Sequence, residues 1–97
     1  MKQTTTRYKS AKDFGKALGL SELDMELARQ KVKLIEKLKA RRIERGLSQA
    51  ALAKRIGSLQ PAIARMESGQ VSQVSMDFLL RIALILDISV TISKKTA

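Results

Sequence analysis

The sequence contains no cysteine and no histidine. A chain without them has no disulfides, no Cys or His metal sites, no thiolate nucleophile and no Ser/His or Cys/His catalytic pair. It also has no run of about 18 uncharged apolar residues and no apolar stretch of signal-peptide length near its start. We therefore expect a cytoplasmic protein with no membrane segment, no cofactor, no metal and no enzymatic activity.

The 97 residues suffice for one domain with a single hydrophobic core. Lysine and arginine number 19 against 9 acidic residues, a formal net charge of +10, while 44% of the residues are apolar. That apolar fraction is typical of folded proteins, and a positive excess of this size favours a polyanionic partner such as DNA or RNA. The alternative is a protein that is merely soluble and basic.

Residues 1–20 are interpreted as a basic N-terminal arm with a balance of +4, polar and threonine-rich at its start. Ser10 is a candidate cap for a short helix through Leu18 within this arm. The remaining residues, 21–97, are assigned to one domain.

A long helix is predicted over residues 21–45, because Ser21 and Asp24 form a capping-box pattern and Gly46 supplies a positive-φ stop. Its apolar residues fall into two neighbouring stripes on a helical wheel. The first holds Leu23, Leu27, Leu34 and Leu38, and the second holds Met25, Ala28, Val32, Ile35 and Ile43. Either one stripe packs inside the domain while part of the other meets a partner or the N-terminal segment, or the helix is kinked or broken and both stripes are core.

Two short helices are predicted next, over residues 49–56 and 61–68. Ser48 is the expected cap of the first. Proline is accepted in the first turn of a helix, so Pro61 marks the start of the second.

Two short helices joined by a glycine-containing turn form a helix-turn-helix arrangement, here over residues 48–69, whose second helix enters the DNA major groove. Ala53 stands where the helices cross, because a larger side chain would force them apart. Gly57 turns the chain, and Ile63 packs the second helix onto the first. Leu52, Ile56 and Met66 complete the small core. A helical hairpin in any bundle is the alternative reading of this spacing.

The chain is expected to end in an apolar helix and a strand. Ser75 caps the helix, which runs through Leu86 and is expected to be the buried centre of the domain. Residues 88–93 alternate apolar and hydroxyl side chains, which predicts a strand. Its unpaired backbone would invite a second copy of the chain or a partner's edge strand.

The motif resembles that of the Xre/Cro-like helix-turn-helix repressors in the stretch GLSQAALAKRIG, followed by SLQPAIARMESG and a capped apolar helix. The resemblance covers residues 34–88 and implies an all-α fold. The expected fold is a five-helix Cro/repressor-like domain, here with an N-terminal helical extension and a short C-terminal β-strand. The flanking segments are also similar to those of the HigA-type antitoxins.

The resemblance implies a sequence-specific transcriptional repressor that is also the antitoxin of a type II toxin–antitoxin pair, binding its toxin and autoregulating its operon. A stand-alone regulator of the same family is the alternative. The implied partners are a palindromic double-stranded DNA operator, a second copy of the chain and a toxin. A small basic endoribonuclease toxin also fits the size and charge, but the chain has no histidine as general base and a helix-rich pattern.

The resemblance also implies the DNA contacts. It places Gln49 at the start of the first motif helix, where the family contacts the DNA backbone, and Gln60 and Arg65 at base-facing positions. Glutamine can bridge adenine N6 and N7, arginine can bridge guanine O6 and N7, and alanine can lie against a thymine methyl. The expected base-reading residues are Gln60, Ala62, Ala64 and Arg65, and the expected backbone contacts are Gln49, Lys54, Ser58, Ser68 and Gln70. A solvated surface arginine is the alternative for Arg65.

Arg42 and Glu67 are kept out of the DNA contacts. Arg42 projects from between the two apolar stripes, where a charge without a partner would be costly. The resemblance suggests that these two side chains form a structural ion pair. Leu59 departs from the family pattern, in which Ser or Thr often caps the recognition helix, and Pro61 replaces a residue that contacts a base in some relatives.

Overall fold

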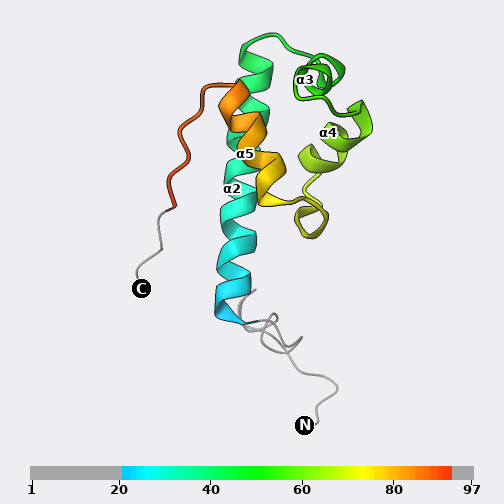
Figure 1. Cartoon of the computed structure of the whole chain (residues 1–97). Helices are drawn as coiled ribbons and strands as arrows, with labels where there is room; N and C mark the ends of the chain where they lie inside the picture. Colours follow the sequence, from blue (N-terminus) through cyan, green and yellow to red (C-terminus); the bar gives the residue numbers. More distant parts are fainter. Residues whose placement is uncertain (1–20, 93–97) are drawn as a thin grey trace.

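Helix α2 is the axis on which the other elements are built (Figure 1). The computed structural model describes residues 21–92, and α2 runs without interruption over Glu22–Glu44. Its cap is the predicted one, since Ser21 Oγ accepts a hydrogen bond from Asp24 N at 3.0 Å. Gly46 leaves the helix with a φ of 68°. The helix is therefore continuous through both apolar stripes.

The other elements follow the predicted order closely. Within residues 21–92 the chain forms four α-helices and one 3-10 turn: α2, α3 (Gln49–Arg55), α4 (Gln60–Glu67), η1 (Val71–Gln73) and α5 (Met76–Ile85). Ser48 and Ser75 cap α3 and α5 as predicted, because their Oγ atoms accept from Ala51 N at 3.0 Å and from Phe78 N at 3.1 Å. These serines fix where two of the helices begin.

The expectation of five helices and a C-terminal β-strand is wrong. The described residues contain four α-helices and no strand. After α5 ends, Asp87 takes a left-handed φ of 57°, and the residues that follow include β-branched Ile88, Val90 and Ile92, which do not favour a fifth helix. Residues 88–92 stay outside any strand because a strand exists only through hydrogen bonds to a neighbouring one, and residues 21–92 supply no such neighbour.

Two predictions lie partly or wholly outside the described residues. The short helix over residues 10–18 of the N-terminal arm falls in the part that the structure does not describe. Residue 93, the last of the predicted strand, does so as well. The correction of the strand therefore rests on residues 88–92.

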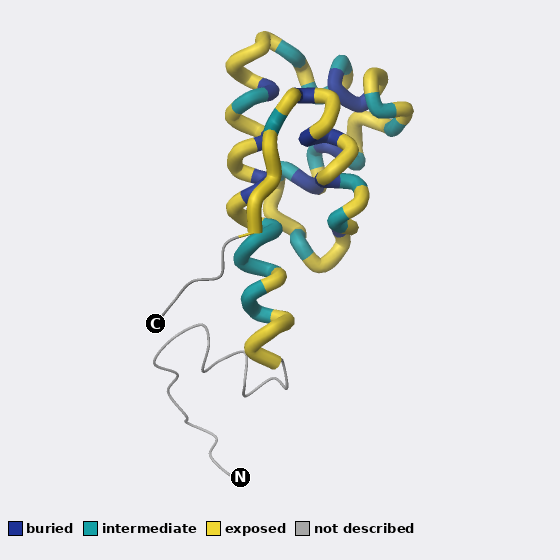
Figure 2. The backbone as a smooth tube through the Cα atoms, turned by 60° about the vertical axis from the view of Figure 1, so that its left-hand side comes forward, coloured by how far each residue is buried: buried dark blue, intermediate teal, exposed yellow. Residues whose placement is uncertain are grey.

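The hydrophobic core lies where the four helices meet. Leu38 of α2, Leu52 of α3, Ile63 of α4 and Ile82 of α5 are all fully buried. Figure 2 shows that the buried part of α2 lies in its second half, whereas the turns nearest its start are exposed or half-buried. Burial of the apolar side chains of α2 therefore depends more on their position along the helix than on the stripe to which they belong. The members that reach the core are Leu34, Ile35 and Leu38.

Helix α5 is buried on one face only, so the expectation that it forms the buried centre of the domain holds for half of its surface. Leu79, Ile82 and Ala83 are in the core. Leu84, by contrast, is 78% exposed. One face of α5 packs against α2, whereas residues 21–92 leave Leu84 on another side largely uncovered.

Cations of α2 fasten the other elements to it. Lys31 Nζ donates to Val74 O at 2.7 Å and so holds the end of η1. Arg41 Nη1 donates to Leu86 O at 2.7 Å, which satisfies a carbonyl at the end of α5 that has no partner inside the helix. Part of the positive charge on α2 therefore serves the fold.

Candidate nucleic-acid interface

Helices α3 and α4 are joined by the turn that the sequence predicts. Gly57 has a φ of 70°, which only glycine adopts at little cost. Ser58 N donates to Ala53 O at 2.8 Å, closing the end of α3. Ala53 and Ile63 are 2% and 0% exposed, so the small and the β-branched residue lie in the core as predicted.

The four residues of α4 that are expected to read bases are distributed around the helix. At about 100° per residue, the face opposite the buried Ile63 carries Pro61 and Arg65, and Ala64 lies beside that face. Gln60 and Ala62 lie on opposite flanks of that face. The four residues expected to read bases therefore do not share one face: Gln60 and Arg65 are exposed, whereas Ala62 and Ala64 are half-buried.

Gln60 is held on its flank by a residue of α3. Its Nε2 donates to Gln49 Oε1 at 2.6 Å, so the first residues of the two motif helices are in contact through their side chains. Gln49 in turn donates from Nε2 to Glu67 Oε1 at 2.9 Å. A residue expected at the DNA backbone and a residue expected at the bases thus belong to one hydrogen-bonded cluster.

Glu67 and Arg42 form the buried end of that cluster. Arg42 Nε donates to Glu67 Oε2 at 2.6 Å, and Arg42 Nη2 donates to Glu67 Oε1 at 2.9 Å. The third guanidinium nitrogen, Nη1, donates to Leu47 O at 2.6 Å. The two side chains are only 11% and 3% exposed, so neither is free to meet a ligand at the surface.

The surroundings of Glu67 favour its charged form. Burial raises the pKa of this carboxyl, but hydrogen bonds from Arg42 and Gln49, with the charges of Arg42 and Lys39, outweigh burial. The net result is a pKa below the ordinary value of 4.5. Glu67 is therefore an ionised acceptor at neutral pH.

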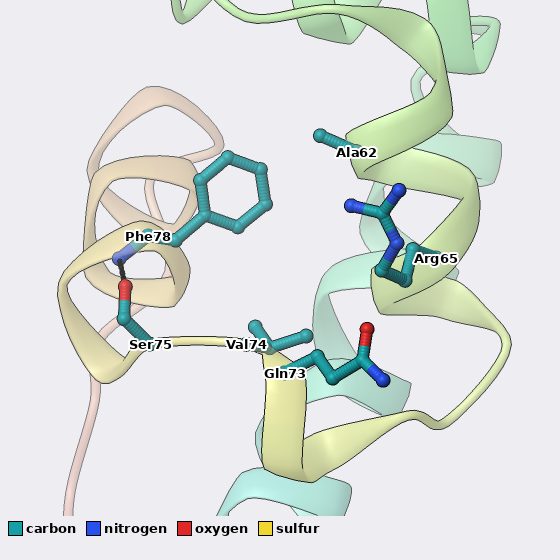
Figure 3. Close-up of a pocket in the computed structure, with 6 residues that line it drawn as sticks. All are labelled: Ala62, Arg65, Gln73, Val74, Ser75 and Phe78. Atoms are coloured by element: carbon teal, nitrogen blue, oxygen red, sulfur yellow. Dashed lines mark hydrogen bonds between the residues drawn. The ribbon is translucent and has the colours of Figure 1, made fainter.

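An open cleft borders the other flank of α4, with a volume of about 250 Å³. It is lined by Ala62, Arg65, Gln73, Val74, Ser75 and Phe78. In Figure 3 the guanidinium of Arg65 extends along this cleft toward Ala62, with the ring of Phe78 across from it. Arg65 has no ion-pair partner among the described residues, which leaves its donors free for an external acceptor.

A family model described as Helix-turn-helix matches residues 38–92, more than half of the chain. The chain belongs to this helix-turn-helix family. Its members are DNA-binding transcriptional regulators of the Xre type, generally not enzymes. Comparison with curated proteins and with solved structures finds no match. The helix-turn-helix match spans the last turns of α2 and all of α3, α4, η1 and α5.

The other residues expected at the DNA backbone are spread around this helix-turn-helix unit. Lys54 is exposed in the last turn of α3, Ser58 is half-buried in the turn, and Gln70 is exposed before η1. Ser68 differs from them because its Oγ donates to Arg65 O at 2.7 Å. With its proton committed to α4, Ser68 is the least suited of the set to donate to a phosphate.

Leu59 leaves α4 without a side-chain cap. It stands at the N-cap position of α4, makes no side-chain cap hydrogen bond and is 75% exposed. Only the backbone closes the first turn, with Ala62 N donating to Leu59 O at 3.0 Å. The departure from the family pattern is therefore a real gap in the capping of α4, next to Gln60.

Sequence reasoning missed the contacts of Gln49 with Gln60 and Glu67. One signal was present: Gln60 and Glu67 are seven residues apart, which places both on the same side of α4. Gln49 lies next to this side of α4 only because of the way α3 crosses α4, and no local sequence pattern specifies that crossing.

No helix within residues 21–92 is long and apolar enough to cross a membrane. In the same part of the chain, no group of three or more acidic side chains is placed to hold a metal ion. The groups on α3 and α4 that are expected at DNA include amides, the ammonium of Lys54 and the guanidinium of Arg65, which can hydrogen-bond to phosphates and base edges.

Proposed function

We propose that the chain is a sequence-specific transcriptional repressor that binds a palindromic DNA operator as a homodimer. Helix α4 enters the major groove and reads base edges through Gln60 and Arg65. The observation that carries this proposal is the exposure of both side chains on α4, together with the lack of an ion-pair partner for Arg65 within the described residues. Arginine and glutamine are the side chains that recognise guanine and adenine through paired contacts.

The remaining contacts are assigned around these two. Ala64, beside Arg65 on the outward side, meets a thymine methyl more directly than Ala62, which lines the cleft. Gln49, Lys54, Ser58 and Gln70 contact phosphates and fix the register of the protein on the duplex. Ser68 belongs to the same set but contributes least, since its hydroxyl proton is already used.

The homodimer is supported by apolar side chains that residues 21–92 leave exposed on α2, on α5 and in the segment after α5. Leu84 is 78% exposed, Ile92 is 74% exposed and Ile43, in the last turns of α2, is 57% exposed. A second copy that covers such side chains removes them from water. Two copies related by a two-fold axis place their recognition helices about 34 Å apart, one turn of the DNA.

The proposed role as antitoxin is supported by the first turns of α2. Leu23 and Leu27 are 77% and 47% exposed and lie far from α4 along the helix (Figure 1). A toxin docked there leaves the recognition helix free, as autoregulation requires. The alternative is a stand-alone regulator without a toxin. Co-expression with the product of the adjacent gene discriminates between them: co-purification favours the antitoxin, and its failure favours the stand-alone regulator.

A gel-shift experiment tests the proposed repressor. The full chain is titrated into a duplex from upstream of its own gene and, as a control, into an unrelated duplex of equal length, at physiological salt. A shift at lower protein concentration for the upstream duplex is expected. Equal affinity for both duplexes contradicts autoregulation through specific DNA binding.

A further inference from the structure

A chain of four hydrogen-bonded side chains leads from the core to the DNA-facing flank of α4. Arg42 donates to Glu67 twice, Gln49 Nε2 donates to Glu67 Oε1 at 2.9 Å, and Gln60 Nε2 donates to Gln49 Oε1 at 2.6 Å. Burial decreases along it: Arg42 is buried, Gln49 is half-buried and Gln60 is exposed. This series of hydrogen bonds thus begins at a fixed ion pair and ends at a side chain that reaches solvent.

The ionised carboxylate of Glu67 fixes which atoms donate and which accept in this series of hydrogen bonds. A carboxylate only accepts hydrogen bonds, so Gln49 must turn its Nε2 toward Glu67. If the Gln49 amide were reversed, its carbonyl oxygen would face the carboxylate oxygen, and that pair repels. The charge of Glu67 therefore fixes Gln49 Oε1 as the atom that faces Gln60.

The same reasoning fixes the amide of Gln60. Gln49 Oε1 takes one N–H of Gln60 Nε2, which leaves the second N–H and the Oε1 atom of Gln60 for another partner. Adenine presents an acceptor, N7, and a donor, N6–H₂, in the major groove, whereas guanine presents two acceptors. A donor beside an acceptor matches adenine, and guanine would set its O6 against the Gln60 carbonyl.

We propose that Glu67 is a positioning residue for base reading. Acting through Gln49, it holds the Gln60 amide in the orientation that selects adenine over guanine at one position of each half-site. This inference rests on the proposed function, because it requires Gln60 to lie in the major groove.

The test is selection from a library of duplexes with a randomised central segment, followed by sequencing. The full wild-type chain and the Gln60→Ala, Gln49→Ala and Gln70→Ala variants are compared after thermal unfolding has shown that each is folded. Gln70→Ala is the matched control, because it too removes a proposed phosphate contact but lies outside the chain of hydrogen bonds. Gln49→Met, close in length to glutamine, replaces Gln49→Ala if the shorter side chain impairs folding.

The wild-type chain is expected to prefer adenine over guanine by roughly tenfold at the position that Gln60→Ala relaxes. Gln49→Ala should lose that preference at the same position, whereas Gln70→Ala should weaken binding to all sequences equally and keep it. If Gln49→Ala keeps the preference that Gln60→Ala loses, the positioning role is wrong and the proposed function stands. If the wild-type chain enriches no sequence, the proposed function itself is wrong.

Glu67→Gln separates the role of the carboxylate from that of Gln49. Its amide can offer either a donor or an acceptor to Gln49, so the amides of Gln49 and Gln60 lose their fixed direction. We expect this variant to bind the selected duplexes with adenine and guanine accepted nearly equally at the Gln60 position. An unchanged adenine preference in a folded Glu67→Gln chain overturns the proposal.

Discussion

Arg42 and Glu67 lie 25 residues apart in the sequence and meet in a doubly hydrogen-bonded ion pair that joins α2 to the end of α4. The pair shows that part of the positive charge of α2 stabilises the fold. Arg42 is buried with Glu67, and Lys31 and Arg41 hold the ends of η1 and α5. The charge of the chain is thus divided between binding the fold together and attracting DNA.

Breaking the buried pair should cost far more than breaking an exposed one. Arg42→Ala leaves Glu67 charged and buried, so we expect the free energy of unfolding to fall by about 3–5 kcal/mol. Glu44→Ala is the control, because Glu44 pairs with Arg41 at 3.3 Å but its side chain is 74% exposed. There the loss should stay below about 1 kcal/mol. Urea denaturation measures both, and equal losses would mean that the buried Arg42–Glu67 pair contributes no more to the free energy of unfolding than the exposed pair.

Acid should weaken the fold through Glu67. Its pKa in the folded chain lies below the ordinary value of 4.5, so its contribution to stability is present above that value and disappears as the pH falls through the lowered pKa. We expect the urea midpoint of the wild-type chain to drop between neutral pH and about pH 3. Glu67→Gln should start lower and change less over the same range.

Glu26→Gln is the control for this pH dependence. The pKa of Glu26 is also lowered, by hydrogen bonds from Arg29 and Gln30, but these are contacts within one helix near the surface. Its replacement should leave most of the acid sensitivity in place. If Glu26→Gln flattens the pH profile as much as Glu67→Gln does, the buried pair is not the acid-sensitive element.

Arg65→Ala should relax sequence preference at one base position, at a cost of about 1–3 kcal/mol for the preferred base. Arg81→Ala is the matched control, since Arg81 is an exposed arginine on α5 outside the interface. It should lower affinity slightly or not at all and leave the preferred sequence unchanged. Fluorescence anisotropy on duplexes that differ at single positions measures both, and an unchanged preference in Arg65→Ala removes this residue from the base-reading set.

A chain that ends at Asp87 should lose the dimer, because it lacks Ile92 and Val90, the exposed apolar residues that follow α5. Analytical ultracentrifugation of this truncated chain and of the full chain measures the change. Leu23→Ser is the control, as Leu23 is 77% exposed at the other end of α2 and should leave the dimer intact. A truncated chain that stays dimeric rejects the role of the C-terminal segment.

Features set by local chemistry could be predicted from the sequence. Ser21, Ser48 and Ser75 cap three helices, and a serine hydroxyl that accepts from the backbone N–H three residues on needs no distant partner. The turn at Gly57 follows in the same way from a backbone conformation that only glycine adopts cheaply. The turn at Gly57 and the cap at Ser75 therefore locate α4 between them.

Features that depend on neighbouring parts of the fold could not be predicted from the sequence. The alternation of Ile88, Val90 and Ile92 is a strand pattern, but a strand needs a second one beside it, and the described residues offer none. Burial of α5 depends on how many sides other helices cover, so its composition alone did not reveal that Leu84 is exposed. The bond between Gln49 and Gln60 depends on how α3 crosses α4.

The most direct test of the account is library selection with the wild-type chain and with a Gln60→Ala/Arg65→Ala double variant, each at low and at physiological salt. We expect the wild-type chain to enrich a palindromic motif. The double variant should keep salt-sensitive DNA binding, supplied by the remaining positive charge, and enrich nothing. The same motif recovered from the double variant would contradict the central claim that these two side chains of α4 read the sequence.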